Sequence, residues 1–525
     1  MMKTIIKKIT YLAVCLIGLN SCDDYLTTKP HDFLAPETFY TNLSNCEMAL
    51  SGVYSTLSRE QFYGNHYILE LVVGNDLCYF QRKLSTTNTK VCSNTHTFSN
   101  STIFGTWTAL YSGINNANMF IENIDKSELD NDTKNRMKGE AKFLRAYYHW
   151  ILVQGWHEVP LRKTSFKDVN ASSMEATSHT EALEWIIDEM EECVNMVDST
   201  MYTSSPSYVK KNTVMGILAR VYLWKAGCPG KGGKEDYKKA AYWANEVIQS
   251  GQHKLNPDYE DIWKKMASDQ YDPIYNESIW EAEFYGTRTD GNETLGRLGN
   301  VIGNVNKGQQ YGYGYAAPTL ILYDLYPEGD IRRDVSICTY RIEDNEGTKY
   351  DLSRYIPRCN CGKFRREWED LHGYTADKNY TGLNWPILRY SDVILMFAEA
   401  ENEVNGASAA AFEAINTVRK RAGIPTLSGL DQEGLRQEIR DERARELCFE
   451  ALRKFDLVRW GTYVDALTKD LAKSMEDRTR WGNGLDFNET PEALTINTTE
   501  KHQYWPIPET ELSVNGLLDQ NTYWK

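Results

Sequence analysis

Three tyrosines alternate with glycines in the segment "QQYGYGYAA", where Tyr311, Tyr313 and Tyr315 stand two residues apart. Aromatic rings bury a large area and lose few rotatable bonds on binding. The apolar C–H faces of sugar rings lie on such platforms, and the glycines leave the tyrosine rings room to face solvent. In an extended chain these three side chains share one face. We interpret the segment as a sugar platform; a strand with one buried face is the alternative.

Two further loops combine aromatic rings with amides and charges that hydrogen-bond sugar hydroxyl groups. The first loop, "VVGNDLCYFQRK", contains Asn75, Asp76, Tyr79, Phe80 and Gln81. The second loop, "EFYGTRTDGNET", contains Tyr285, Arg288 and Asp290. Most rings in a chain with 33 Tyr and 14 Trp are expected in the core. Aromatic residues in polar, glycine-rich loops are therefore the better candidates for ligand contact.

Motifs for enzyme chemistry are missing. The sequence has no G-x-S-x-G, P-loop, H-E-x-x-H or dinucleotide-binding motif. Cys359 and Cys361 in "RCNCGK" lack the second pair or nearby histidine that a metal site needs. We therefore expect a binding protein without catalytic residues, metal or cofactor. A glycoside hydrolase is the alternative from another class, because only the fold would reveal a catalytic pair among 73 acidic residues.

The composition limits the partners and the domain organisation. The formal net charge is −15, and loss of Lys3, Lys7 and Lys8 with an N-terminal signal would leave −18. Such a surface repels phosphate backbones, so we expect no nucleic acid partner. Hydrophobic residues make up 41% of the chain, and no Ser/Pro-rich linker divides it. We expect two halves, residues 22–255 and 256–525, that form one compact body.

The N-terminal residues have the order of a secretory signal. Basic residues precede 11 mostly apolar residues, 9–19, a run too short to span a membrane, which takes about 20. The following "LNSC" resembles the lipobox of bacterial lipoproteins. That resemblance implies that residues 1–21 are removed and that acylated Cys22 anchors the chain in a membrane. An ordinary signal peptide that happens to contain a cysteine is the alternative.

The other cysteines do not suggest a disulfide framework. Nine remain once Cys15 and Cys22 are set aside, and frameworks favour even counts in short chains. Cys46, Cys193 and Cys448 lie in helical patterns and are expected in the core. Pairing of Cys78 with Cys92 across a loop stays open.

Apolar residues recur at helical spacing in pairs of segments. The pairs are residues 138–155 with 179–197, 212–227 with 237–251, and 388–406 with 408–423, and a looser helix covers 103–124. In segment 237–251 the apolar stripe is predicted to consist of Ala240, Ala244, Val247 and Ile248. Small residues at the expected crossings, such as Ala240 and Ala244, indicate tetratricopeptide-like (TPR-like) pairs. The same periodicity fits any helical bundle. Residues 256–380 are rich in Gly, Tyr, Asn and Asp, which predicts loops and short strands.

A cluster of opposite charges lies in "IRDERARELCFEALRKFDLVRWG", residues 439–461. Glu442, Glu446 and Glu450 stand at helical spacing from Arg443 and Arg445. Such carboxylates resemble a catalytic group, but we interpret them as a partly buried ionic network that joins this helix to the helix pairs. Arg145 and Arg220 are interpreted likewise, with apolar packing of the stem and a polar partner for the head.

The chain resembles the SusD/RagB family of surface nutrient-binding lipoproteins of Bacteroidetes over nearly its whole length. The matching segments, in order, are "CDDYLTTKP", "WTALYSGINNAN", "GEAKFLRAYYHWILVQGWHEVPL", "LARVYLWKAG", "AAYWANEVIQSG", "LRYSDVILMFAEAENEVN", "AINTVRKRAGI", the 439–461 helix and "YWPIPETELSVNGLLDQN". Each segment is weak alone, and the order and spacing carry the resemblance. Asp23 and Asp24 after Cys22 are similar to the family's surface-export signal.

The resemblance implies a mostly helical SusD-like fold with four TPR-like pairs and a loop-rich, partly β middle region. It also implies a surface lipoprotein of the outer membrane that delivers an oligosaccharide to a SusC-like TonB-dependent transporter. A peptide or glycoprotein fragment, as in the RagB branch, is the alternative ligand. Ligand contacts in the family come from the loop before the "W-x-x-L-Y" helix and the loops after the "E-S-I-W" strand, whereas Trp107 belongs to the scaffold. The ligand's identity is not in the sequence.

Overall fold

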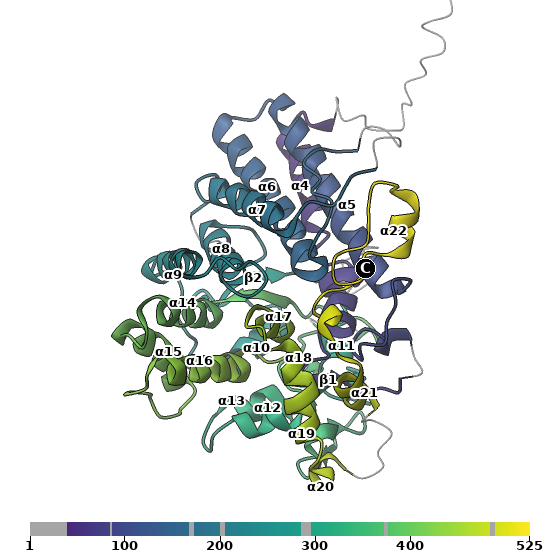
Figure 1. Cartoon of the computed structure of the whole chain (residues 1–525), viewed down its shortest axis with the longest axis vertical. Coiled ribbons are helices and arrows are strands. Elements are labelled where there is room, and N and C mark those ends of the chain that lie inside the picture. The colour runs from purple at the N-terminus through teal and green to yellow at the C-terminus, as the bar shows by residue number, and fades with distance from the viewer. Residues whose placement is uncertain are drawn as a thin grey trace, which may run out of the picture.

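The computed structural model describes residues 39–84, 87–166, 173–199, 205–284, 296–371, 376–482 and 489–525. The predicted signal and lipidation site Cys22 and the loop residues Tyr285, Arg288 and Asp290 lie outside them. The described part is mostly helical, with short strands between the helices (Figure 1). This confirms the predicted fold class, a mainly helical scaffold with a loop-rich, partly β middle region.

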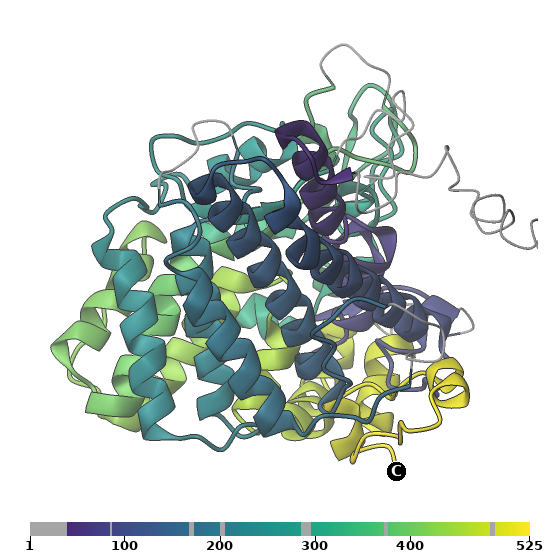
Figure 2. The ribbon, with the colours of Figure 1, turned by 90° about the horizontal axis from the view of Figure 1, so that it is seen from above.

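The long helices lie side by side, as Figure 2 shows. They are α4 (Leu43–Tyr54), α5 (Ser101–Asn123), α6 (Asn131–Trp156), α7 (His179–Cys193), α8 (Lys211–Ala226), α9 (Lys234–Gln249), α14 (Tyr390–Asn405), α15 (Ala409–Arg421) and α16 (Gln432–Leu447). Each helix from α4 to α9 contacts the next, and α9 then contacts α14, which contacts α15 and α16. The segments predicted as helices are therefore helices, packed as successive neighbours.

Local chemistry sets where these helices begin and end. The side chains of Asn100, Asp130 and Ser178 accept hydrogen bonds from backbone N–H groups in the first turns of α5, α6 and α7, which would otherwise lack partners. Gly406 and Gly423 follow α14 and α15 with φ of 74° and 75°. Glycine adopts this left-handed conformation without the strain that a Cβ brings, so it ends a helix readily.

Small side chains allow close helix packing. Ala240, Ala244 and Val247 are the buried residues of α9, the helix that contacts both α8 and α14. These three residues belong to the apolar stripe that the sequence predicts, which confirms the stripe.

The C-terminal tail is held against α6 by close contact. Trp505 N–H donates to the carbonyl oxygen of Gly155 at 2.8 Å, and the Trp156 indole N–H donates to Pro506 O at 2.9 Å. A Cβ on Gly155 would lie 2.4 Å from Cζ3 of Trp505. Only glycine fits between the helix and this indole, so two motifs far apart in sequence form one contact. Trp107, buried beside Trp156, belongs to the scaffold as expected.

Short elements fill the middle of the chain, as the composition predicts. The helices are α10 (Tyr259–Ala267), α11 (Leu298–Val301), α12 (Leu320–Leu325) and α13 (Arg332–Ser336). The strands are β1 (Cys78–Phe80), β2 (Ser278–Ala282), β3 (Ala316–Pro318), β4 (Ile337–Cys338), β5 (Tyr340–Ile342), β6 (Lys349–Asp351), β7 (Asn360–Cys361) and β8 (Trp385–Arg389). In the described part they form two-stranded antiparallel sheets: β1 with β3, β2 with β8, β4 with β7 and β5 with β6.

The C-terminal part continues in short helices around this middle region. They are α17 (Arg453–Arg459), α18 (Tyr463–Asp465), η8 (Ala466–Leu471), α19 (Ala472–Ser474), α20 (Arg478–Trp481), α21 (Glu489–Asn497) and α22 (Glu509–Val514). Of these, α21 contacts β1. The C-terminal part therefore supports the strand that lies within the first candidate loop.

Buried ion pairs tie α16 to the rest of the protein. Glu446 lies among three guanidinium groups, at 3.0 Å from Arg332, 3.1 Å from Arg389 and 2.6 Å from Arg421. Burial opposes ionisation of this carboxyl, but the three positive charges outweigh burial and hold its pKa well below the usual range. This confirms the predicted ionic network and shows that it is fully buried.

A second centre of the network joins α8, α14, α16 and α17. Arg443 contacts Asp392 at 2.8 Å and Asp456 at 3.0 Å, and Arg220 contacts the same Asp392 at 2.7 Å. Burial opposes ionisation of Asp456 as well, but Arg443 and Arg459 lower its pKa to about 2. Each carboxylate here serves two guanidinium groups, so these charges are structural.

Candidate ligand-binding site

A cleft of about 550 Å³ lies where the first candidate loop meets the tyrosine segment. Its lining residues are Gln81, Arg82, Lys83, Val305, Lys307, Tyr313, Gly314, Tyr315, Arg341, Leu352 and Arg358. The structure thus brings together Gln81 and Tyr313, two candidates that are more than 200 residues apart in the sequence. We call this the tyrosine cleft.

Backbone hydrogen bonds fix the two walls of the tyrosine cleft against each other. Strand β1 pairs with β3, with Phe80 opposite Ala316, and Gln81 N–H donates to Tyr315 O at 2.7 Å. Gly314 has φ of +65°, and a Cβ there would lie 2.7 Å from Cγ2 of Val305. The glycine therefore allows both the turn and the close approach that place the two flanking tyrosines.

The three tyrosine rings form one row. The ring centroids of Tyr311 and Tyr313 are 5.0 Å apart with an interplanar angle of 76°, and those of Tyr313 and Tyr315 are 5.3 Å apart at 12°. All three side chains are half-buried. Residues 311–315 do not form a strand with a buried face, since β3 begins only at Ala316. The rings hold one another in place while part of each remains accessible.

Basic groups stand at the ends of the row. The Arg82 guanidinium lies 4.7 Å from the Tyr315 ring centroid, and Lys378 Nζ lies 4.8 Å from that of Tyr311. Burial raises the pKa of the Tyr315 hydroxyl, and the charge of Arg82 opposes that rise. The hydroxyl is therefore protonated at neutral pH and able to donate a hydrogen bond.

Gln81 is half-buried at the edge of the cleft. Its Nε2 donates to Pro357 O at 2.8 Å, which fixes the amide plane. A side-chain amide carries two donor hydrogens and an acceptor oxygen. Gln81 is therefore a positioned polar group beside the tyrosine row.

Three predicted contact residues lie in the interior instead. Asn75 Oδ1 accepts from the N–H groups of Leu77 and Cys78 at 2.9 and 3.1 Å, which closes the turn before β1. Asp76 forms a two-pronged pair with Arg453 at 2.9 and 2.6 Å. Phe80 is 1% exposed and packs edge-on against Tyr315. In the described structure these side chains build the wall of the cleft rather than its surface.

Sequence reasoning missed the basic residues of the cleft. Arg82 directly follows Gln81, and this adjacency was a usable signal. Lys307, Arg341 and Arg358 gave no such signal, because they are far from Gln81 and from one another in the sequence. They meet because Lys307 N–H donates to Ile342 O at 3.0 Å beside β5, and because β4 and β7 pair.

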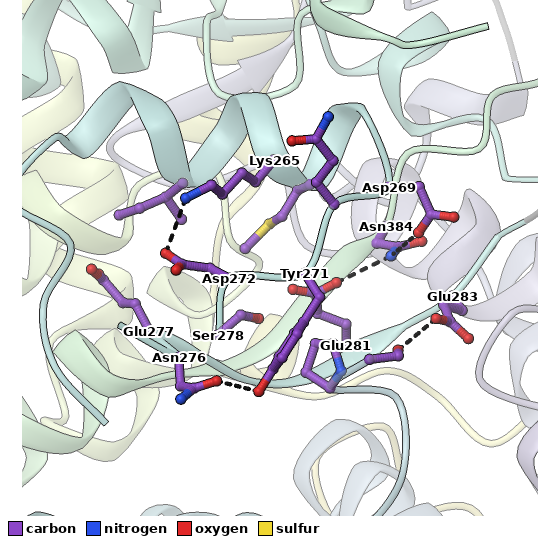
Figure 3. Close-up of a pocket in the computed structure, with 15 residues that line it drawn as sticks. Lys265, Asp269, Tyr271, Asp272, Asn276, Glu277, Ser278, Glu281, Glu283 and Asn384 are labelled. Atoms are coloured by element: carbon purple, nitrogen blue, oxygen red, sulfur yellow. Dashed lines mark hydrogen bonds and ion pairs between the residues drawn. The ribbon is translucent and has the colours of Figure 1, made fainter. Parts of the chain in front are cut away.

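A second hollow, beside α10 and β2, is lined by carboxylates (Figure 3). Asn384 Nδ2 donates to Asp269 at 3.3 Å and to Glu281 at 3.1 Å, and burial raises the pKa of Glu281 to about 7. The hollow measures about 40 Å³, which suits a few water molecules. Small-molecule sites usually span about 300–1,000 Å³. This hollow is therefore much smaller than a typical small-molecule site.

The cysteines do not assemble a metal or redox site in the described part of the chain. Cys78 and Cys92 are buried free thiols, and so are Cys359 and Cys361. No group of three or more His, Cys, Asp or Glu among the described residues is arranged to hold a metal ion. Cys46, Cys193 and Cys448 are buried, as predicted.

Within the described residues, every helix is too short or too polar to cross a bilayer.

Two family models match the chain. The model described as "SusD family" matches residues 359–524, and the model described as "Starch-binding associating with outer membrane" matches residues 24–223. The intervening residues 224–358 contain the tyrosine row and three of the basic residues of the cleft. The matches therefore cover most of the long helices and the Gln81 wall, and leave the wall with the tyrosine row outside both models.

Similar proteins extend over most of the chain. The SusD-like protein P2 of Formosa agariphila is 28% identical, over 86% of this chain and 90% of its own length. The starch-binding protein SusD of Bacteroides thetaiotaomicron is 24% identical, over 77% of this chain and 75% of its own. The crystal structure of a SusD homolog from Bacteroides thetaiotaomicron matches with a TM-score of 0.84 at 26% identity, over 93% of this chain and 98% of that chain.

Proposed function

We propose that this chain, which belongs to the SusD/RagB family, binds an oligosaccharide in the tyrosine cleft. The observation that carries the proposal is the row of Tyr311, Tyr313 and Tyr315 beside a cleft of about 550 Å³. Concave sites of this size, with rings and a few positioned polar groups, are typical of small-ligand sites. The matched family description and the starch-binding relative support a glycan as the ligand.

The proposal divides the predicted residues by role. Tyr311 and Tyr313, with Tyr315, supply the surface for sugar C–H faces, and Gln81 supplies hydrogen bonds to hydroxyl groups. Asn75, Asp76 and Phe80 position the wall from within. Tyr285 and Arg288, which lie outside the described residues, remain candidate contacts on the basis of the sequence alone.

The cellular role follows from the family and the N-terminal signal. We propose that acylated Cys22 anchors the protein in the outer membrane, with the body exposed at the cell surface. There it would capture an oligosaccharide and pass it to a SusC-like TonB-dependent transporter. The matched description, which names association with the outer membrane, supports the location.

Electrophoresis through gels that contain single polysaccharides tests the proposal. Retarded migration in at least one gel is expected, without new reducing ends when protein and polysaccharide are incubated together. Released reducing sugar would identify a glycoside hydrolase instead. Binding of peptides or glycoprotein fragments, with no retardation by any polysaccharide, would favour the RagB-type alternative.

A further inference from the structure

The charge of the tyrosine cleft is opposite to that of the chain. The whole chain carries −15, yet among the described residues that line the cleft five are basic and none is acidic. They are Arg82, Lys83, Lys307, Arg341 and Arg358. A concave surface lined by one sign of charge concentrates ligands of the opposite sign. The cleft therefore attracts anions, although the protein as a whole is negatively charged.

On one wall, the carboxylate partner of Lys307 and Arg341 does not balance their charge. Lys307 and Arg341 share one carboxylate, that of Glu343. The hydrogen bonds that these two cations donate lower the pKa of Glu343, so this carboxylate is ionised at neutral pH. Two positive charges against one negative charge leave a net positive charge on this wall.

The opposite wall carries a second unbalanced charge. No ion pair joins Arg82 to a carboxylate of the described residues, and its guanidinium contacts the Tyr315 ring instead. Guanidinium groups stacked on rings retain N–H donors at their edges for another ligand. A ligand that lies along the tyrosine row would reach these donors.

The interior shows what paired arginines look like in this protein. Arg332 contacts Asp330, Glu442 and Glu446 at 2.7, 2.6 and 3.0 Å. Such arginines have their donors occupied by fixed carboxylates. Lys307, Arg341 and Arg82 differ in having fewer fixed carboxylate partners among the described residues than they have charges, which is what a site for an anionic ligand needs.

We propose that the ligand of the tyrosine cleft is an acidic glycan. Its sugar rings lie on the tyrosine row, and its carboxylate or sulfate groups bind Arg82 on one wall and Arg341 and Lys307 on the other. This inference rests on the proposed function and names the ligand class of the same site. Guanidinium groups suit both substituents, because each offers two oxygens to the planar fork.

Matched polysaccharide pairs test the inference, since the members of each pair share a sugar backbone and differ in whether they carry anionic groups. One pair is polygalacturonate and its fully methyl-esterified form, which tests carboxylates. The other is dextran sulfate and dextran, which tests sulfate esters. Gel retardation and calorimetric titration are run at low and high sodium chloride concentration, because added salt screens exposed charges.

Variants locate the effect in the cleft. Arg82→Gln and Arg341→Gln should each weaken binding of the acidic member at least about tenfold, since hydrogen bonds to charged groups are the strong ones. Arg82→Lys should retain more affinity than Arg82→Gln. Lys238→Gln on α9, an exposed cation paired with Glu235, is the matched control and should change nothing. Thermal unfolding confirms that each variant folds.

The outcomes separate this inference from the proposed function. Salt-sensitive binding of one acidic member, lost in Arg82→Gln, supports the inference. Equal or exclusive binding of neutral polysaccharides overturns it and leaves the proposed function standing. An acidic preference that survives both glutamine variants overturns the assignment to the cleft. No retention of any polysaccharide overturns the proposed function and this inference with it.

Discussion

Arginines in two regions of this protein have opposite surroundings. Around α16 they are buried and matched by carboxylates, as where Glu446 meets three guanidinium groups. In the other region they line the open tyrosine cleft, and Lys307 and Arg341 share the carboxylate of Glu343. Residue type alone therefore does not distinguish an arginine that stabilises the fold from one that is available to a ligand. The number of fixed carboxylate partners and the burial of the charge distinguish them.

The largest expected effect is a loss of stability when a carboxylate of the buried ionic network is removed. Glu446→Gln leaves Arg332, Arg389 and Arg421 with one carboxylate fewer in a buried site. Removing one partner of a buried ion pair typically costs about 3–5 kcal/mol, and urea denaturation should show a loss of that size. Asp465→Asn, which breaks the exposed pair with Lys469, is the control and should change stability far less, because solvent screens exposed pairs. Equal effects would contradict the distinction between the two kinds of pair.

Low pH should destabilise the protein through the same ionic network. Asp456 has a folded-state pKa of about 2, lowered from 3.8 by Arg443 and Arg459 against the effect of burial. A carboxyl with a lowered folded pKa stabilises the protein above its unfolded pKa, and that stability is lost as pH falls through the folded value. Asp456 should therefore contribute about 2.5 kcal/mol that disappears between about pH 4 and pH 2.

Unfolding free energies measured across that range check this prediction. In Asp456→Asn the corresponding stability should already be missing at neutral pH, and the acid-dependent loss should shrink. A variant with an unchanged acid profile would show that Asp456 is not a main source of the pH dependence.

The next prediction concerns the row of tyrosine rings in the cleft. Tyr313→Ala removes the middle ring of the row, and truncation of such an anchor costs about 2 kcal/mol or more of binding free energy. We expect at least about tenfold weaker glycan binding, measured by titration calorimetry. Tyr242→Ala, at an exposed ring on α9, is the matched control. Early melting of Tyr313→Ala with unchanged affinity would make the ring structural.

The smallest expected effect is a gain in ligand affinity rather than a loss. Glu343→Gln removes the carboxylate that Lys307 and Arg341 share, so it frees both cations for an anionic ligand. Affinity for the acidic glycan should rise only a few-fold, because solvent screens exposed charge pairs. Stability should hardly change. Weaker binding of the acidic glycan in this variant would indicate that Glu343 itself contacts the ligand.

Much of the scaffold could be predicted from the sequence, because its signals are local. The stripe of Ala240, Ala244 and Val247 follows from helical spacing. The interpretation of Arg220 as a packed stem with a polar partner holds, because its guanidinium donates to Asp392 and to the carbonyl of Ile387. Helix periodicity and charge spacing were sufficient for these predictions.

The candidate site was only partly predictable, because its decisive contacts are between distant residues. Asn75 and Asp76 resemble exposed loop residues in sequence, yet Asp76 pairs with Arg453, 377 positions away. The alternation of Tyr311, Tyr313 and Tyr315 with glycine did reveal the row. The basic residues of the cleft were not predicted, because Lys307 and Arg341 carry no motif and become neighbours of the tyrosine row only through the fold.

A crystal structure of the protein with a fragment of the polysaccharide that it retains tests the central claim most directly. We predict a sugar ring in contact with Tyr313 and Tyr315, with an anionic substituent within hydrogen-bond distance of the Arg82 guanidinium. A sugar bound elsewhere on the protein, with the tyrosine cleft unoccupied at saturating ligand, would contradict the account.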